Sequence, residues 1–307
     1  MKKATFLFFI IFVSVQAYSQ DWIWGIKATG SPQYSEDMDI AVDHEGNTVI
    51  AGYYQLGLNL GACSLYTADD YYSDIFLCRM DSQHHVQWLK HIETGTTYDY
   101  GIGVTTDDDK NIYVTGGMDG SIFASKYDSL GNQLWLCDFN RKFYGQGNDI
   151  AVDPFDNVYI TGKNSGNTLV AKLDYDGNVV WTKQFIGCHS NGCQGNDIAV
   201  DEFGTIYVAG TFECESLMID NFKVTFKYSW GDQTYVTKIS TDGKVLWAIS
   251  PEGATNSIPQ IALTSNGFYL CGSATTPIDF GGIMLTKVAG GNDGNPFIAR
   301  MTAMGKS

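Results

Sequence analysis

One alternating pattern of apolar and polar positions recurs along the chain. It is clearest in Asp149–Gly162 (DIAVDPFDNVYITG), returns from Asp39, Gly103 and Asp197, and decays in Gln260–Gly272. Each copy predicts a short apolar strand, an Asp-initiated turn and a second β-rich strand. The Asp carboxylate can accept backbone N–H groups two residues on, and Gly or Asn later in the turn tolerates positive φ. The pattern therefore predicts hairpins in which the turn Asp is structural.

A second pair of predicted strands follows each hairpin and ends in a tryptophan. These tryptophans are Trp88, Trp135, Trp181 and Trp247. Units of roughly 40–50 residues with four short strands are typical of β-propeller blades. The fifth unit stops after Phe297–Thr302, where its tryptophan strand is due, whereas the N-terminal Trp22–Gly25 belongs to no unit. We predict an all-β, five-bladed propeller of four-stranded antiparallel blades. The N-terminal strand closes the ring by pairing with Phe297–Met301, which removes an exposed sheet edge.

The full unit resembles a known repeat family. It reads Asp-Ile-Ala-Val-Asp-x-x-Gly-Asn-x-x-Ile-x-Gly, then Phe-x-x-(Lys/Arg)-x-Asp-x-x-Gly-x-x-x-Trp. This is similar to the bacterial beta-propeller repeat family, often called seven-bladed beta-propeller repeats. The likeness covers essentially all of residues 21–307, although this chain shows five units and Thr264 replaces the turn Asp in the fifth. The resemblance implies a propeller fold and no defined activity. The second half alone also resembles repeats of quinoprotein dehydrogenases and outer-membrane assembly scaffolds.

The first twenty residues predict a signal peptide. Lys2 and Lys3 precede the apolar run Phe6–Val15, and a small-residue cleavage pattern ends at Ala17. Cleavage near residues 17–20 would leave residues 21–307 as a single propeller domain. The run is too short to span a bilayer, and no other stretch approaches eighteen apolar residues. We expect an exported bacterial protein, secreted, periplasmic or at the cell surface, that is monomeric and has no transmembrane segment.

The net charge bears on the class of binding partner, and the cysteine content bears on disulfide bonds and metal sites. A formal net charge of −15 would repel phosphate backbones and anionic lipids, which argues against nucleic-acid binding. The 7 cysteines are an odd number, so at least one is unpaired. Cys188 and Cys193 flank a short Gly-containing loop and form the candidate disulfide. The alternative is a Cys-His-Cys metal site around His189, for which no further ligand is visible nearby.

The connections between strands point to a candidate binding face. Those between the second and third strands are long in units 1, 4 and 5 (Tyr53–Asp74, Thr211–Thr234 and Ser273–Pro296) and lie on one face of the predicted ring. Tyrosine and tryptophan there offer flat, amphipathic contact area for sugar rings or a protein partner. The candidate ligand-binding residues are Tyr53, Tyr54, Tyr71, Tyr72, Tyr100, Tyr144 and Trp230. The alternative is that these side chains pack against added hairpins.

Carboxylates at the starts of the first strands suggest a possible cation site. Asp39, Asp149 and Asp197 recur near the expected channel mouth, where converging oxygens could bind Ca²⁺. Alternatively, they satisfy backbone donors. No other cofactor is expected.

The sequence favours a binding module over an enzyme. No His-Glu-x-x-His, Gly-x-Ser-x-Gly or phosphate-loop motif is present. We therefore expect a non-enzymatic binding or interaction module for a protein or glycan partner at the cell surface. A carbohydrate-binding propeller or glycoside hydrolase with paired carboxylates is one alternative. A structural component of a surface assembly is the other.

Overall fold

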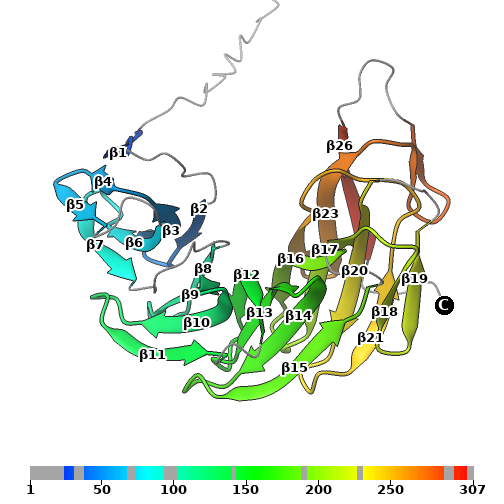
Figure 1. Ribbon diagram of the computed structural model, residues 1–307, viewed down its shortest axis with the longest axis horizontal. Helices are drawn as coiled ribbons and strands as arrows, with labels where there is room; N and C mark the ends of the chain where they lie inside the picture. Colours follow the sequence, from blue (N-terminus) through cyan, green and yellow to red (C-terminus); the bar gives the residue numbers. More distant parts are fainter. Residues whose placement is uncertain are drawn as a thin grey trace, which may run out of the picture.

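The computed structural model describes residues 24–30, 38–67, 73–92, 102–139, 143–187, 192–226, 231–286 and 294–302. All the regular secondary structure in this part of the chain consists of β-strands. Figure 1 shows the sheets following one another along an arc, from β1–β7 at one end to β22–β26 at the other. Within the same residues, no helix is long and apolar enough to cross a membrane. The predicted signal peptide, residues 1–20, lies outside them.

Units 1 to 4 each form one antiparallel sheet of four strands, which we call main sheets 1 to 4. Main sheet 1 contains β2 (Met38–Val42), β3 (Thr48–Tyr54), β6 (Asp74–Met80) and β7 (Val86–Ile92). Main sheet 2 contains β8 (Ile102–Thr106), β9 (Ile112–Met118), β10 (Ser121–Tyr127) and β11 (Gln133–Asp138). Main sheet 3 contains β12 (Gly145–Val152), β13 (Val158–Asn164), β14 (Asn167–Leu173) and β15 (Val179–Phe185). Main sheet 4 contains β16 (Cys193–Val200), β17 (Ile206–Phe212), β20 (Gln233–Ile239) and β21 (Val245–Ile249). The predicted all-β architecture of four-stranded antiparallel sheets is confirmed.

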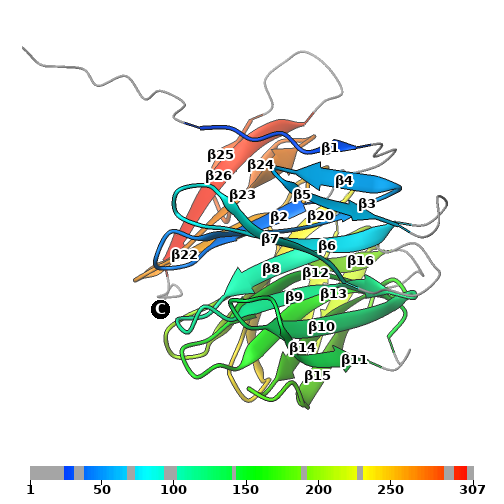
Figure 2. The same ribbon diagram turned by 90° about the vertical axis from the view of Figure 1, so that its left-hand side faces the viewer.

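Unit 5 forms main sheet 5, which has three strands: β22 (Gln260–Thr264), β23 (Gly267–Ala274) and β26 (Asn295–Thr302). The predicted pairing of Trp22–Gly25 with Phe297–Met301 is not found among the described residues. Trp24 and Gly25 lie in no strand. The N-terminal strand is instead β1 (Thr29–Gly30), which pairs with β4 (Gly57–Leu60) of unit 1, as Figure 2 shows. Strand β1 is not the segment for which closure was predicted, so closure of the ring by residues 22–25 stays a prediction.

Three added hairpins extend the connections between second and third strands. They are β4–β5 (Cys63–Tyr66), β18–β19 (Ser216–Ile219 and Phe222–Thr225) and β24–β25 (Ile278–Asp279 and Met284–Leu285), in units 1, 4 and 5. These are the units for which the sequence predicted long insertions.

The hydrophobic core lies between neighbouring main sheets. Separate clusters of buried apolar side chains fill the spaces between sheets 1 and 2, 2 and 3, 3 and 4, and 4 and 5. The first strands β2, β8, β12, β16 and β22 lie side by side in that order. A fifth cluster, with Tyr54, Phe76 and Cys78, covers the other side of main sheet 1 beneath β4 and β5. Sheets stacked face to face in this way bury apolar side chains on both faces of each inner sheet.

The turn between first and second strands follows the predicted design. In unit 3, Asp153 Oδ1 accepts the backbone N–H groups of Phe155 and Asn157 at 2.9 Å each, and Asp153 Oδ2 accepts the Tyr159 hydroxyl at 2.8 Å. Equivalent carboxylate bonds form at Asp43, Asp107 and Asp201. The fourth residue of the turn has positive φ, and it is glycine in units 1 and 4 but Lys110 and Asp156 in units 2 and 3.

Asp156→Gly should stabilise the protein. Asp156 has φ of 61°, which strains any residue with a side chain. Relief of this strain should raise the free energy of unfolding by about 1 kcal/mol, measured by urea denaturation. Asp156→Ala is the matched control, because it removes the same carboxylate and keeps the strain. Equal effects of the two variants would assign the change to charge rather than to backbone conformation.

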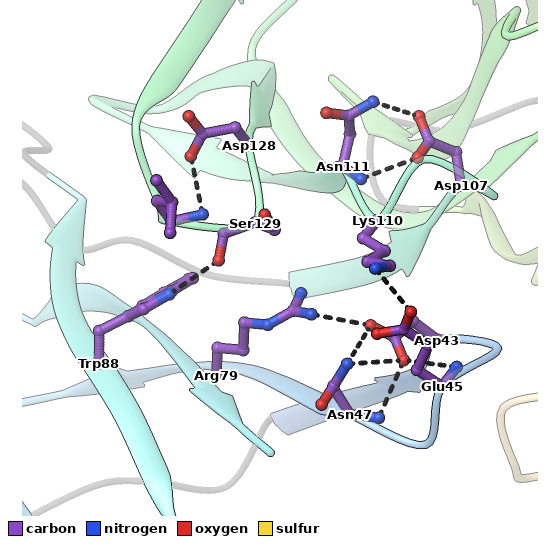
Figure 3. A network of polar contacts seen from close by, with 11 residues as sticks. Asp43, Glu45, Asn47, Arg79, Trp88, Asp107, Lys110, Asn111, Asp128 and Ser129 are labelled. Carbon is purple, nitrogen blue, oxygen red and sulfur yellow. Dashed lines mark hydrogen bonds and ion pairs between the residues drawn. The ribbon is translucent and has the colours of Figure 1, made fainter. Parts of the chain in front are cut away.

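Tryptophan side chains join each main sheet to the next. The indole N–H groups of Trp88, Trp135 and Trp181 donate to the carbonyl oxygens of Ser129, Tyr175 and Thr241 at 3.1, 3.0 and 3.2 Å. Each acceptor is the second residue of the turn between third and fourth strands in the following unit. Figure 3 shows the first of these bonds together with Arg79–Asp43 and Lys110–Glu45, which are ion pairs. The tryptophans of units 1, 2 and 3 thus bond each of these units to the next.

Trp181→Phe should lower the free energy of unfolding by about 1–2 kcal/mol. The variant retains an aromatic ring but loses the hydrogen bond to Thr241. Trp247→Phe is the matched control, because the Trp247 indole donates no hydrogen bond among the described residues and packs on Phe268 instead. Chemical denaturation of both variants provides the measurement. An equal loss in both would mean that ring packing, and not the hydrogen bond, joins the sheets.

Candidate functional site

The three aspartates proposed as cation ligands join neighbouring main sheets. Asp39 Oδ2 accepts the Val104 N–H at 2.8 Å, Asp149 Oδ2 the Ile198 N–H at 2.7 Å and Asp197 Oδ2 the Ile261 N–H at 2.6 Å. Each bond therefore runs from one first strand to the first strand of a following sheet. This agrees with the alternative that these carboxylates satisfy backbone donors. No group of three or more His, Cys, Asp or Glu residues within the described ranges could hold a metal ion.

In unit 2, Gly103 stands where units 1, 3 and 4 have Asp39, Asp149 and Asp197, and the reason is steric. A Cβ atom on Gly103 would lie 2.7 Å from the Cα atom of Asp149 in the next sheet, too close for any other residue. An aspartate at position 103 would accept a hydrogen bond from the Ile150 N–H. That N–H donates instead to Asp149 Oδ1 at 2.8 Å. The first strands of sheets 2 and 3 therefore approach more closely than a side chain would allow.

The pKa of Asp149 is raised well above its ordinary value of 3.8. Burial is the main cause, and the neighbouring Asp197 carboxyl group adds to it. Asp149 therefore holds its proton in the folded protein over a pH range in which it is ionised in the unfolded chain. Its contribution to stability is complete below pH 3.8 and is lost as pH rises through the raised pKa.

Asp149→Asn should consequently cost most stability near pH 4 and less at pH 7–8. The asparagine has no proton to lose, so the difference in unfolding free energy from wild type should shrink as pH rises. Asp43→Asn is the control, because the pKa of Asp43 is shifted in the opposite direction. Burial of Asp43 opposes its ionisation, but hydrogen bonds from Asn47 and Glu45 and the charge of Arg79 together lower its pKa. Its cost should shrink as pH falls below about 4. If urea denaturation showed the stability costs of the two variants changing in the same direction with pH, the opposite pKa shifts assigned to Asp149 and Asp43 would be refuted.

The candidate ligand-binding residues do not all reach the surface. Tyr54 is fully buried against Phe76 and cannot contact a ligand. Its hydroxyl has no hydrogen-bond partner among the described residues, and burial together with the charge of Asp74 raises its pKa to about 12. Tyr53 is half-buried against the core between sheets 1 and 2. Tyr144 is exposed. Tyr71, Tyr72, Tyr100 and Trp230 lie outside the described residues.

Tyr54 was expected at the surface because it begins a long insertion. Strand β3 continues through it instead, since Tyr54 pairs with Asp74 at the start of β6. Side chains alternate between the two faces of a strand. Tyr54 therefore points to the side covered by β4, whereas Tyr53 points to main sheet 2.

The added hairpins are anchored to the end of the preceding sheet. Ile186, just after β15, exchanges two backbone hydrogen bonds of 3.1 Å with Met218 of β18. Glu252, after β21, does the same with Asp279 of β24 at 2.9 and 2.8 Å. One side of each hairpin enters the core through residues such as Leu58, Leu217 and Ile278. The insertions are therefore rigid parts of the scaffold.

The opposite side of each hairpin exposes apolar side chains. Sequence reasoning missed these residues, because only pairing within each hairpin decides which side chains face outward. They are Tyr66 on β5, Met218 on β18 and Met284 on β25, together with the exposed Ile283 just before β25. Together with Tyr144 they define what we call the insertion face. Tyr144 belongs to it because the Phe143 and Tyr144 segment bonds to the start of β10.

The structure also brings two pairs of carboxyl groups together. The Asp197 carboxyl group lies beside Asp149, and that of Glu213 beside Asp232, and each neighbour contributes to a raised pKa. Burial first, and then Glu213, raises the pKa of Asp232.

The candidate disulfide cannot be assessed directly, since Cys188 lies outside the described residues. Cys193 and Cys214 are both buried in the core between sheets 3 and 4 and border Gly187. This proximity was not apparent from the sequence, because 20 residues separate them.

Comparisons with known proteins agree with the repeat pattern. Residues 180–211 match the SBBP beta-propeller repeat family, so the predicted resemblance is confirmed over that segment. No curated protein matches the chain.

Several solved structures are similar in fold. A protein of unknown function from Dyadobacter fermentans is 8% identical, with 80% of this chain and 78% of that chain covered and a TM-score of 0.48. The Dos1 propeller is 14% identical, with 82% and 70% covered and a TM-score of 0.40. A gluconolactonase from Xanthomonas campestris is 12% identical, with 80% and 86% covered and a TM-score of 0.39. Likeness at this level says nothing about activity or ligand.

Proposed function

We propose that the five main sheets are the blades of one β-propeller and that the protein is an exported, non-enzymatic binding module acting through its insertion face. The observation that carries the proposal is the exposure of apolar side chains on all three added hairpins. Where exposed apolar side chains form a contiguous patch on a soluble protein, the patch marks an interaction site. Because the hairpins are bonded to the sheets, they present these side chains on a rigid support.

The chemistry of the insertion face suits a protein or glycan partner. Tyr66 and Tyr144 offer flat rings with a polar end, which can stack on a sugar or enter a protein interface. Met218 and Met284 add flexible apolar contacts that adapt to a partner's shape. Binding of this kind needs no cofactor. The protein would act at the cell surface, in the periplasm or in the medium.

A glycan array and the envelope fraction of producing cells are suitable probes. We expect the purified protein to bind at least one of them, with no loss on adding a calcium chelator. Tyr66→Ala and Tyr144→Ala should each weaken that binding by about tenfold, as loss of an aromatic contact does. Phe155→Ala and Phe203→Ala are matched controls, because these exposed rings lie in turns at the opposite ends of the strands. Equal losses in both pairs, or no binding to either probe, would contradict the proposal.

A further inference from the structure

We propose that Cys193 and Cys214 are oxidised to a disulfide that ties the added hairpin of unit 4 to the first strand of main sheet 4. The sequence alone suggested Cys188 as the partner of Cys193, whereas the structure brings Cys214 beside Cys193 from 20 residues away. Formation of this bond in the cell rests on the proposed export, because disulfides persist in oxidising compartments. Its formation with a supplied oxidant does not.

The strand register places the two side chains on the same face of main sheet 4. Cys193 is the first residue of β16 and pairs with Phe212, the last residue of β17. Beyond this pair the two segments stay together, because the Glu213 N–H donates to the Gly192 carbonyl oxygen at 2.7 Å. Side chains alternate between the two faces of a strand, so Cys214 points to the same side as Phe212. Cys193 and Cys214 are therefore diagonal neighbours in the core between sheets 3 and 4.

The position of Gly187 shows how close the two sulfur atoms lie. A Cβ atom on Gly187 would be 2.1 Å from Cys193 Sγ and 3.2 Å from Cys214 Sγ. The two sulfur atoms are therefore no farther apart than the sum of these distances. A change of side-chain rotamer moves a sulfur atom by a distance comparable to the gap that remains to an S–S bond of about 2.05 Å. Glycine at position 187 leaves the space that the sulfur atoms need.

The bond would hold the base of the hairpin β18–β19. Cys214 lies just before β18, and its thiol donates to the carbonyl oxygen of Ser216, the first residue of that strand, at 3.0 Å. Gly187 follows Ile186, whose backbone bonds to Met218 on the same strand. Three segments thus meet at the two sulfur atoms: the end of main sheet 3, the start of β16 and the start of the hairpin. A covalent link here would restrict opening of the hairpin that presents Met218 on the insertion face.

The oxidation is a thiol–disulfide exchange with a small-molecule disulfide as the oxidant. The thiolate of one cysteine attacks that disulfide, forms a mixed disulfide and releases one thiol. The second cysteine loses its proton and attacks the mixed disulfide, which forms the Cys193–Cys214 bond and releases the second thiol. Two electrons and two protons pass to the oxidant. Because Cys193 and Cys214 are 2% and 3% exposed, the oxidant reaches them before the hairpin folds or when it opens.

Peptide mapping identifies which cysteines are linked. The full chain would be refolded with oxidised glutathione and then cleaved after lysine, arginine and glutamate. Cleavage at Glu202 separates Cys193 from Cys214, whereas no lysine, arginine or glutamate lies between Cys188 and Cys193. We expect the fragments that contain Cys193 and Cys214 to be linked in wild type and in Cys188→Ala, and unlinked in Cys193→Ala and Cys214→Ala. Unlinked fragments in wild type, or a link that Cys188→Ala abolishes, would overturn the proposal.

Thermal unfolding with and without a reductant tests what the bond does. Reduction should lower the Tm of the oxidised wild type by at least about 5 °C, because a disulfide that closes a loop of this length stabilises the folded state. Cys214→Ala should lose this sensitivity, whereas Cys137→Ala, which removes a thiol from main sheet 2, should keep it. A reductant effect of equal size in Cys214→Ala would contradict the role given to the bond. These readouts are independent of the glycan and envelope probes, so failure of the disulfide and failure of partner binding can be told apart.

Discussion

A β-sheet with apolar side chains on both faces needs a neighbour on each side, and this requirement governs the whole structure. Main sheets 2, 3 and 4 meet it, because a hydrophobic cluster fills each space beside them. The chain adds polar contacts that hold the stack in order: aspartates accept N–H groups of a following first strand, and tryptophans donate to a following turn. Both kinds of bond run from one unit to a later one, so each unit depends on its successors.

Two sets of repeated aspartates serve different purposes although they are only four residues apart in the chain. Asp153 organises a turn and lies near the end of a hairpin, where its carboxylate receives hydrogen bonds from its own unit. Asp149 reaches across to Ile198 and lies beside Asp197. Burial and the neighbouring Asp197 raise the pKa of Asp149. One sequence repeat therefore contains one carboxyl group that is bonded within its own turn and one that bonds to the next sheet.

The added hairpins combine support with exposure. Their inner side chains extend the core, and their backbone bonds attach them to the preceding sheet, so they do not behave as loose loops. Their outer side chains are apolar and accessible. A rigid surface of this kind loses little conformational entropy on binding, which favours a role in recognition. The same attachment explains the short strand β1, since the N-terminal segment contacts the first hairpin as later segments contact theirs.

Local chemistry determined much of this structure from sequence alone. Turn aspartates, glycines such as Gly177 and the recurring tryptophans specify hairpins and four-stranded units, because their effects act within a few residues. Other features depended on which strands pair and which faces meet. Tyr54 is buried and Tyr53 half-exposed because β3 continues past the predicted turn. The closeness of Asp149 to Asp197, and of Asp232 to Glu213, arises between segments distant in the chain. Only tertiary packing decides such contacts, because a repeat motif carries no information about how far apart neighbouring units lie.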